Sequence, residues 1–462
     1  MKRKLAVVLL AVMLLSLMVT GCGKEKKDKP VVTTPLLRIG ILSDIHLNAD
    51  MRHNMYDRFE KALMFYKEKG VDGIVIAGDL QDNREALGAA ITAMDELQDI
   101  WQRVFPNNIN DLTGEYVEPM FIYGNHDKAL VESEFWFDNM GSEYEDAWIK
   151  EVKGYYFVGA HFTKETGALV QKHLEKAMAG SADRPFFYIQ HAPMENTVIG
   201  GASAYDGVEI PSQDLLKRSH NCVVLTGHTH VPLTDERAIW QTNSKKAAQY
   251  TVVSCGTTHY SYLQDFVELE INGDAHQTQQ GIYMVVDGTQ ITMERYSLTD
   301  MELDYENGEA IINLADAKLI GQPWVFDAIQ TKKRPYDYDT RAQKASEPVF
   351  PTDAALEIFE VTDSSAKVTV PAATVTAPEG FSDLIQSYYV EVIDPTTGDV
   401  IKTVEIAAPY HIDDTEERLN QPVSIALTDL TPGTEYTILA YARECFQKAS
   451  EPLTGQLITA LE

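Results

Sequence analysis

The chain has 462 residues, too many for one ordinary domain and suited to two or three. Apolar residues make up 44% of it, enough for sizeable cores, and charged residues make up 23%. The formal net charge of -30 repels phosphate backbones, so we expect no nucleic-acid partner. A small phosphorylated substrate could still bind where metal cations reverse the local field.

The first twenty-two residues have the pattern of an export signal. A basic start at residues 1–4 precedes an apolar stretch at 5–19, which is shorter than the roughly 20 residues of a membrane-spanning helix. The segment resembles a bacterial lipoprotein signal. This resemblance implies that Cys22 carries a lipid anchor and that the protein lies outside the cytoplasm on the cell membrane. A plain signal peptide cut elsewhere is the alternative.

Residues 23–35 mix lysines with acidic residues and lack hydrophobic periodicity. We predict a flexible tether here.

Cysteines are few, since only Cys222, Cys255 and Cys445 follow Cys22. They cannot form the dense disulfide framework of small secreted domains. We predict buried free thiols, with one disulfide among the later three as the alternative.

From residue 36 onward, five short apolar runs each end in a polar cluster. The runs cover residues 37–42, 73–77, 120–123, 186–189 and 222–225. The clusters that close them are Ser43-Asp44-Ile45-His46, Gly78-Asp79, Gly124-Asn125-His126-Asp127, Gln190-His191 and Gly227-His228-Thr229-His230. Apolar stripes at helical spacing lie between the first three runs. Alternating strands and helices predict an α/β domain, in which functional groups gather beyond the carboxyl ends of the strands.

These clusters contain donors for two divalent metal ions. Asp79 has two carboxylate oxygens and can bridge two cations, and Asn125 adds a neutral oxygen. Mixed oxygen and imidazole donors favour first-row metals over calcium, which prefers oxygen alone. The expected metal ligands are Asp44, His46, Asp79, Asn125, His191, His228 and His230.

Two residues next to the expected ligands suit catalysis. Two metals roughly 3.5–4 Å apart polarise a phosphoryl group for in-line attack, and the leaving oxygen then needs a proton. His126 follows Asn125 and can supply this proton, and Asp127 could orient the imidazole. Each motif alone is weak, and the Gly-His-Thr-His cluster could be a structural zinc corner. Five motifs in order, each closing an apolar run, indicate one site.

The five motifs in this order resemble the calcineurin-like metallophosphoesterase family. The similarity covers residues 36–262 and reaches, in weaker form, about residue 343. It implies a double β-sheet sandwich flanked by helices, and two metal ions (Mn, Fe or Zn). By resemblance, Asp44, His46, Asp79 and His230 hold one metal, and Asp79, Asn125, His191 and His228 hold the other. His126 resembles the family's histidine near the scissile phosphate.

The sequence departs from some family members. Purple acid phosphatases have a tyrosine three residues after the bridging aspartate, where this chain has Asp82, so we do not expect an iron–tyrosinate site. Gln190 stands where members often have glycine. We expect core or surface roles for His161 and His259, and His259 is the less certain of the two.

The second half predicts more strands and a separate domain. Runs at 248–255, 266–271, 281–286 and 290–296, with a hairpin turn at Asp287-Gly288, are predicted to complete a catalytic domain over residues 36–331. Charged and proline-containing residues 332–352 predict a linker. Short strands and turns over 353–462 predict an all-β sandwich.

The sandwich resembles a fibronectin type III domain, with Tyr436 as its corner tyrosine, although the usual early tryptophan is absent. We expect it to act as a spacer, and contact with the cell wall or a glycan is the alternative.

The leading expectation is hydrolysis of a phosphate monoester or diester outside the cytoplasm, on a small phosphorylated substrate. A cyclic-nucleotide or other phosphodiesterase is the runner-up. A second class is a cell-surface scaffold with a structural metal site. Residues 194–211 are expected to help select the substrate.

Overall fold

The computed structural model describes residues 35–48, 52–84, 86–136, 144–162, 167–198, 212–217, 219–244, 249–261, 278–306, 309–330, 332, 334–411 and 420–461. The predicted export signal with Cys22, the tether up to residue 34 and the predicted strand at 266–271 lie outside these residues. Most of the loop at 194–211 does so too. Within the described ranges, no helix combines the length and the apolar content that crossing a bilayer requires.

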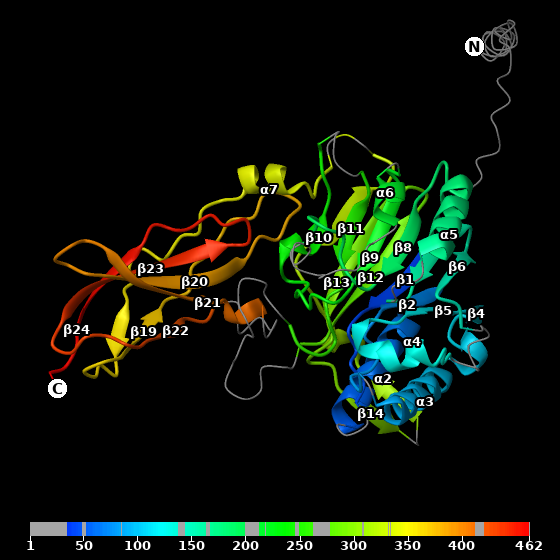
Figure 1. The fold of residues 1–462 in the computed structure, drawn as a ribbon, viewed down its shortest axis with the longest axis horizontal. Coiled ribbons are helices and arrows are strands. Elements are labelled where there is room, and N and C mark those ends of the chain that lie inside the picture. The colour runs from blue at the N-terminus through cyan, green and yellow to red at the C-terminus, as the bar shows by residue number, and fades with distance from the viewer. Residues whose placement is uncertain are drawn as a thin grey trace, which may run out of the picture. The chain divides into compact units, whose positions relative to one another are not determined.

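One sheet contains the strands that precede the first three polar clusters (Figure 1). In spatial order its strands are β16 (Lys318–Leu319), β13 (Gln290–Ser297), β12 (Gln280–Asp287), β1 (Leu37–Leu42), β2 (Gly73–Ala77) and β5 (Glu118–Ile122), and β17 (Trp324–Asp327) also pairs with β13. The β1, β2 and β5 strands are parallel, so their carboxyl ends lie at the same edge. The β12–β13 hairpin turns at Gly288, as predicted, with a φ of 62°.

A second sheet contains the strands that precede the other two clusters. Its order is β10 (Ile239–Trp240), β11 (Thr251–Ser254), β9 (Cys222–Thr226), β8 (Phe186–Gln190), β7 (Tyr155–Ala160) and β6 (Ala147–Val152). The central strands β7, β8, β9 and β11 run parallel, and β8 and β9 are buried on both faces. This double burial explains why their sequences are continuous apolar runs rather than alternating patterns.

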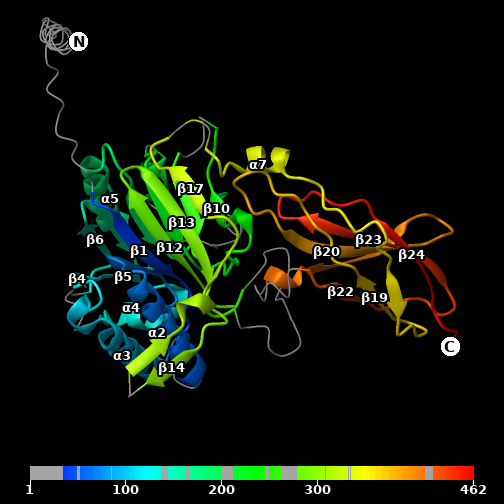
Figure 2. The same cartoon turned by 180° about the vertical axis from the view of Figure 1, so that it is seen from behind.

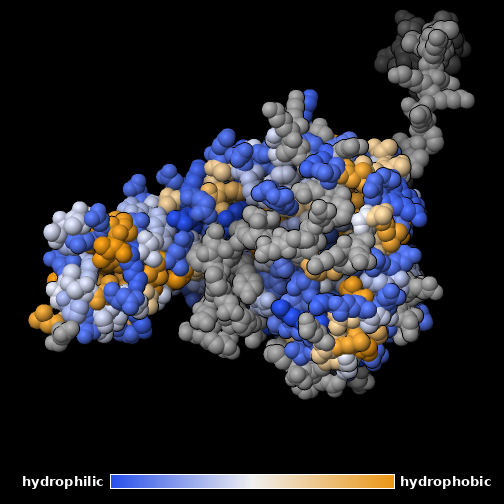
Figure 3. All heavy atoms as spheres, viewed as in Figure 1, coloured by the Kyte–Doolittle hydropathy of each residue, from blue (hydrophilic) through white to orange (hydrophobic). Residues whose placement is uncertain are grey.

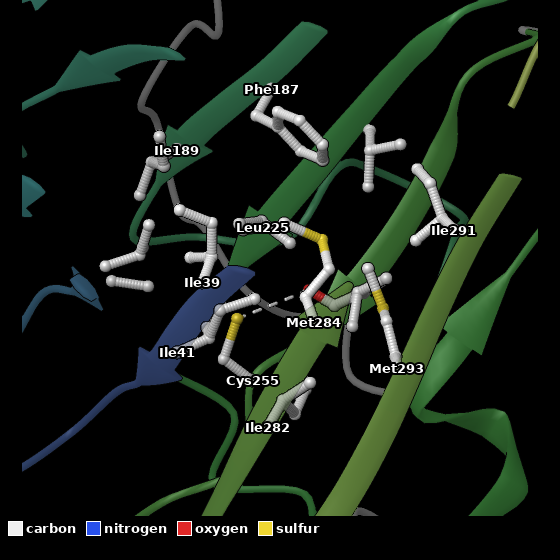
Figure 4. Close-up of a cluster of buried hydrophobic side chains, with 14 of the residues drawn as sticks. Ile39, Ile41, Phe187, Ile189, Leu225, Cys255, Ile282, Met284, Ile291 and Met293 are labelled. Carbon is white, nitrogen blue, oxygen red and sulfur yellow. Dashed lines mark hydrogen bonds between the residues drawn. The ribbon is translucent and has the colours of Figure 1, made fainter. Parts of the chain in front are cut away.

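The two sheets pack face to face through an apolar core. Figure 4 shows Ile39 and Ile41 of β1 opposite Phe187 of β8 and Leu225 of β9, beside Met284 of β12. The thiols of Cys222, Cys255 and Cys445 are buried and free, as predicted.

Helices cover the outer faces of the two sheets. The outer face of the first sheet packs on α2 (Arg52–Glu68) and α3 (Leu87–Val104), beside the hairpin β14 (Leu303–Glu306) and β15 (Glu309–Ile312) (Figure 2). The outer face of the second sheet packs on α5 (Gly167–Gly180). The predicted double β-sheet sandwich flanked by helices is therefore confirmed.

Shorter elements complete this part of the chain. They are β3 (Ile109–Asn110), β4 (Glu115–Tyr116), α4 (Lys128–Glu132), α6 (Ser212–Leu216) and the 3₁₀ turns at Pro106–Asn108, Asn125–Asp127, Glu236–Ala238, Leu314–Asp316 and Pro409–His411. Figure 3 shows that hydrophilic residues dominate the described surface in that view, while hydrophobic ones form small separate patches.

The C-terminal strands form an all-β sandwich with its own core, and we call β18 to β24 the C-terminal sandwich. Its sheets are β18 (Glu357–Phe359), β19 (Ala366–Val370) and β22 (Val423–Leu427), and β21 (Val400–Ala407), β20 (Ile385–Ile393), β23 (Glu435–Glu444) and β24 (Leu453–Ile458). The buried Tyr436 hydroxyl accepts a hydrogen bond of 3.0 Å from the amide of Thr431, as a corner tyrosine would. The fibronectin type remains a prediction.

The predicted linker at 332–352 is more ordered than its composition indicates. It contains helix α7 (Tyr338–Lys344), which Asp337 caps by accepting from the Thr340 amide. Arg334 and Arg341 are only 2% exposed, so the segment is packed and not a free connection. The linker prediction was wrong because Arg341 pairs with Glu236 and Asp383 in distant parts of the chain, which the local composition does not show.

Candidate metal centre

The seven predicted ligands all lie in loops just beyond the carboxyl ends of parallel strands. Asp44 and His46 follow β1, Asp79 follows β2 and Asn125 follows β5. In the other sheet, His191 follows β8, and His228 and His230 follow β9. The face-to-face packing of the sheets brings the two sets together.

The first group of donors consists of Asp44, His46, Asp79 and His230, whose ligand atoms all lie within 4.8 Å of one another. The Nε2 atom of His230 is 3.1 Å from both Oδ1 of Asp44 and Nε2 of His46. Oδ2 of Asp79 is 3.8 Å from Nε2 of His46. All four residues are buried, so the group is a compact, shielded donor set.

The second group shares Asp79 with the first. Asp79, His191 and His228 also lie within 4.8 Å of one another. Oδ2 of Asp79 is 3.1 Å from Nε2 of His191. The side-chain oxygen of Asn125 is 3.0 Å from the same nitrogen and 2.8 Å from Nδ1 of His228. One carboxylate oxygen of Asp79 therefore faces both groups, as a bridging ligand must.

The orientation of the imidazoles fits a bound cation. Nδ1 of His191 is 2.8 Å from the carbonyl oxygen of Ala77, and Nδ1 of His230 is 2.9 Å from that of Tyr260. A carbonyl can only accept, so each Nδ1 carries a proton, and each Nε2 is the nitrogen that faces carboxylate oxygens and would bind a metal ion. A carbonyl behind a metal-binding histidine is a usual arrangement at metal sites.

The ionisation of the site in the absence of metal is consistent with this geometry. Burial alone would lower the pKa of His191, but the carboxylate of Asp79 raises it to about 9. Burial would raise the pKa of Asp44, but His230 lowers it to about 2. In the absence of metal, a proton on the His191 imidazole therefore provides the positive charge that a bound metal ion would otherwise provide.

The backbone is strained at most of the ligands. The φ angle is positive at Asp44 (52°), His46 (47°), Asp79 (51°), His228 (69°) and His230 (49°). Such angles cost about 1–3 kcal/mol each for non-glycine residues and cluster at functional sites. The fold therefore holds these side chains in place at the expense of backbone strain.

The glycines of the motifs make room for the ligands. A Cβ atom on Gly124 would lie 2.2 Å from Oδ1 of Asp79, and one on Gly227 would lie 2.5 Å from Oδ2 of Asp44. Both positions require a residue without a side chain because a carboxylate ligand occupies the space.

His126 lies beside the metal groups with two charged neighbours. Its amide donates to Oδ1 of Asp79 at 2.8 Å, which ties the histidine to the residue that both donor groups share. Its Nδ1 is 2.5 Å from Oδ1 of Asp82, and its Nε2 is 2.7 Å from a terminal guanidinium nitrogen of Arg84. The hydrogen bond with His126, then that with His46, lowers the pKa of Asp82, so this carboxylate is ionised. His46, Asp82 and His126 form a third group of donors within 4.8 Å.

Asp127 does not orient the His126 ring, so that prediction was wrong. Its Oδ2 accepts from the amides of Gly124 at 2.8 Å and Leu80 at 3.0 Å, and its Oδ1 accepts from the amide of Gln81 at 3.1 Å. Burial, and then repulsion from Asp79, raises the pKa of Asp127 to about 7. Asp127 joins the loops after β2 and β5, and Asp82 is the residue that orients His126.

The two uncertain histidines lie in different places. His259 lies beside the centre, with its ring centroid 5.4 Å from that of His46, and the ring of its neighbour Tyr260 stacks on His230 at 4.1 Å. His161 is buried, and its Nδ1 accepts from the Tyr123 amide at 2.8 Å. No group of donors found among the described residues includes His161, which fits its predicted core role.

Sequence reasoning missed Arg84 and Tyr260. Arg84 carried a usable signal, because it follows Asp79 by five residues in the loop where an anion would approach. Tyr260 carried none, because its position depends on how the loop after β11 returns to the site.

Comparison with known proteins finds one family model that matches part of the chain, and several solved structures that resemble it. Residues 37–232 match the family model described as calcineurin-like phosphoesterase. No curated protein matches the chain.

Three solved structures illustrate these resemblances. A dimetal phosphatase from Danio rerio is 11% identical, with a TM-score of 0.37, and the match covers 62% of this chain and 99% of that one. A purple acid phosphatase from yellow lupin seeds is 13% identical, with a TM-score of 0.40, and the match covers 58% and 52%. A redesigned β-sandwich protein is 21% identical, with a TM-score of 0.17, and the match covers 25% and 93%.

Proposed function

We propose that this chain is a metal-dependent phosphoesterase that hydrolyses small phosphate esters outside the cytoplasm. Its residues 37–232, which match the calcineurin-like phosphoesterase model, would form the catalytic part. The observation that carries the proposal is the position of Asp79, whose Oδ2 faces both donor groups. The residues that would hold the two metals are Asp44, His46, Asp79 and His230, and Asp79, Asn125, His191 and His228. When bound, such ions polarise the phosphoryl group and activate water at neutral pH.

The remaining residues of the site account for proton transfer and binding of the phosphoryl group. The ionised Asp82 carboxylate holds the Nδ1 proton of His126, so in the imidazolium form Nε2 carries the proton that moves to the leaving oxygen. Arg84 is exposed and contacts this same nitrogen, so its guanidinium is placed to turn to the phosphoryl oxygens when substrate enters.

The export and anchoring part of the proposal rests on the sequence. The basic and apolar order of residues 1–21, with Cys22 after them, supports a lipid-anchored protein on the outer side of the cell membrane. The fibronectin type III-like assignment of 353–462 is supported by the two sheets of three and four strands and by the Tyr436 contact.

Turnover of nitrophenyl phosphate and bis-nitrophenyl phosphate with added Mn²⁺ tests the proposed reaction. We expect metal-dependent hydrolysis of at least one ester by the wild type and loss of that activity in Asp79→Asn. The ratio of the two rates ranks monoester against diester hydrolysis. Equal inactivity of wild type and Asp79→Asn on a broad ester panel would reject the enzyme in favour of a scaffold with a structural metal.

A further inference from the structure

The segment after the last metal ligand carries four consecutive polar residues that are almost fully buried. They are Thr234, Asp235, Glu236 and Arg237, with exposed fractions of 1%, 0%, 1% and 9%. Thr234 comes only four residues after His230. Buried polar groups need hydrogen-bond or ion-pair partners. The partners of these four residues therefore fix the position of the chain just after His230.

The carboxylate of Glu236 links the domain of the two packed sheets to the C-terminal sandwich. One oxygen lies 2.8 Å from the guanidinium of Arg295 in β13, and the other lies 3.3 Å from that of Arg341 in α7. Arg341 in turn pairs at 2.7 Å with Asp383, just before β20 of the sandwich. All four residues are at most 4% exposed, so neither water nor salt screens these pairs effectively.

Aromatic rings of the sandwich fix the position of Arg341. Its guanidinium lies 3.9 Å from the ring centroid of Phe381 and 4.8 Å from that of Phe446. Two rings and two carboxylates hold this planar guanidinium, so the position of Arg341 restrains the position of its partner Glu236.

A second, neutral link joins the same segment to the sandwich. His411 is buried in the 3₁₀ turn after β21, and its Nε2 is 2.9 Å from the carbonyl oxygen of Ile385. Because that carbonyl can only accept, Nε2 carries the proton and Nδ1 accepts the hydroxyl proton of Thr234, at 2.8 Å.

We infer that the C-terminal sandwich is a positioning element of the metal centre. Through Arg341 and His411 it holds the segment that follows His230, and it thereby fixes the loop that carries His228 and His230. The sandwich is therefore more than a spacer. This inference rests on the proposed metal centre, because it concerns the placement of two of its ligands.

Point variants of the full-length protein test the inference. Arg341→Met removes the charged link and keeps an apolar side chain, and Thr234→Val removes only the hydroxyl of the neutral link. Arg443→Met is the matched control, because Arg443 also pairs with a carboxylate (Glu405, 2.9 Å) and covers a ring (Tyr389, 4.4 Å), but entirely within one sheet of the sandwich. Equilibrium dialysis with Mn²⁺ gives the affinity, and thermal unfolding shows which variants are folded.

We expect both link variants to bind both Mn²⁺ ions about tenfold more weakly, because His230 and His228 belong to different donor groups. Such a loss is typical when an outer contact to a metal ligand is removed. Arg443→Met should match the wild type, and Arg341→Lys should recover part of the affinity because it keeps the charge. If Arg341→Met does not fold, the nearly isosteric Thr234→Val decides alone.

Two results would overturn the inference while leaving the proposed function intact. One is an unchanged Mn²⁺ affinity in the folded link variants, and the other is an equal loss in Arg443→Met. A wild type that binds no Mn²⁺ would instead reject the metal centre, and the inference with it.

Discussion

At the scale of single residues, His126 has two neighbours with separate tasks. Asp82 is the closest neighbour of Nδ1, at 2.5 Å, and sets the tautomer. Arg84 lies 3.3 Å from Nδ1 through its Nε and 2.7 Å from Nε2, the atom that faces the leaving group in our proposal. If His126 is the proton donor, its loss matters only where the leaving group needs a proton. We predict that His126→Ala lowers kcat on an alkyl phosphate by about 10²-fold or more and on nitrophenyl phosphate far less.

Steady-state kinetics on the two esters measures this contrast, with metal content as the control. Asp82→Asn should show the same preference in weaker form, since it leaves the imidazole in place. Equal losses on both esters would show that His126 binds substrate or metal and does not donate a proton.

At the scale of elements, Asp127 connects the loops that follow β2 and β5. Its carboxylate accepts from three buried amides, those of Gly124, Leu80 and Gln81. An unpaired buried amide costs roughly 1–3 kcal/mol, so we predict that Asp127→Ala lowers the free energy of unfolding by about 3 kcal/mol. Urea denaturation measures it, with the exposed Asp353→Ala as control. A loss below about 1 kcal/mol would mean that the loops do not depend on this contact.

The loop after β9 gives a second prediction at this scale. A methyl group at Gly227 would lie 2.0 Å from the Ser43 hydroxyl and 2.5 Å from Oδ2 of Asp44, whereas one at Gly88 in α3 would meet nothing within 4 Å. We predict that Gly227→Ala displaces Asp44 and weakens Mn²⁺ binding, while Gly88→Ala leaves it unchanged. Mn²⁺ titration of both variants checks this, and equal affinities would contradict the crowding seen around Asp44.

The sequence predicted most of the strands and the seven side chains that the structure brings together, because each of them closely follows a run of apolar residues that must be buried on both faces. Their role as metal ligands stays a prediction. The roles of Asp82 and Asp127 could not be assigned, since both lie within three residues of a ligand and only the loop backbone decides which one faces His126. The packing of residues 332–352 was also hidden, because Arg341 pairs with Glu236 and Asp383, which lie 105 and 42 residues away. Long-range pairing of charges leaves no local pattern.

At the scale of the whole molecule, the proposal places the catalytic domain outside the cytoplasm on a lipid anchor. The proposed anchor is one cysteine, Cys22, so a single substitution tests it. We predict that Cys22→Ser moves the protein out of the membrane fraction without changing its specific activity. Fractionation and immunoblotting measure the distribution, with Cys445→Ser as a control. An unchanged membrane fraction for Cys22→Ser would argue against lipidation.

The metal content of the purified protein tests the bridging role of Asp79 most directly. After loading with Mn²⁺ and dialysis, elemental analysis should find two metal ions per chain in the wild type. Asp79→Asn should lose both, because Oδ2 of Asp79 faces both donor groups, whereas Asp353→Asn at an exposed position should keep two. Two ions retained by Asp79→Asn, or only one bound by the wild type, would contradict the account.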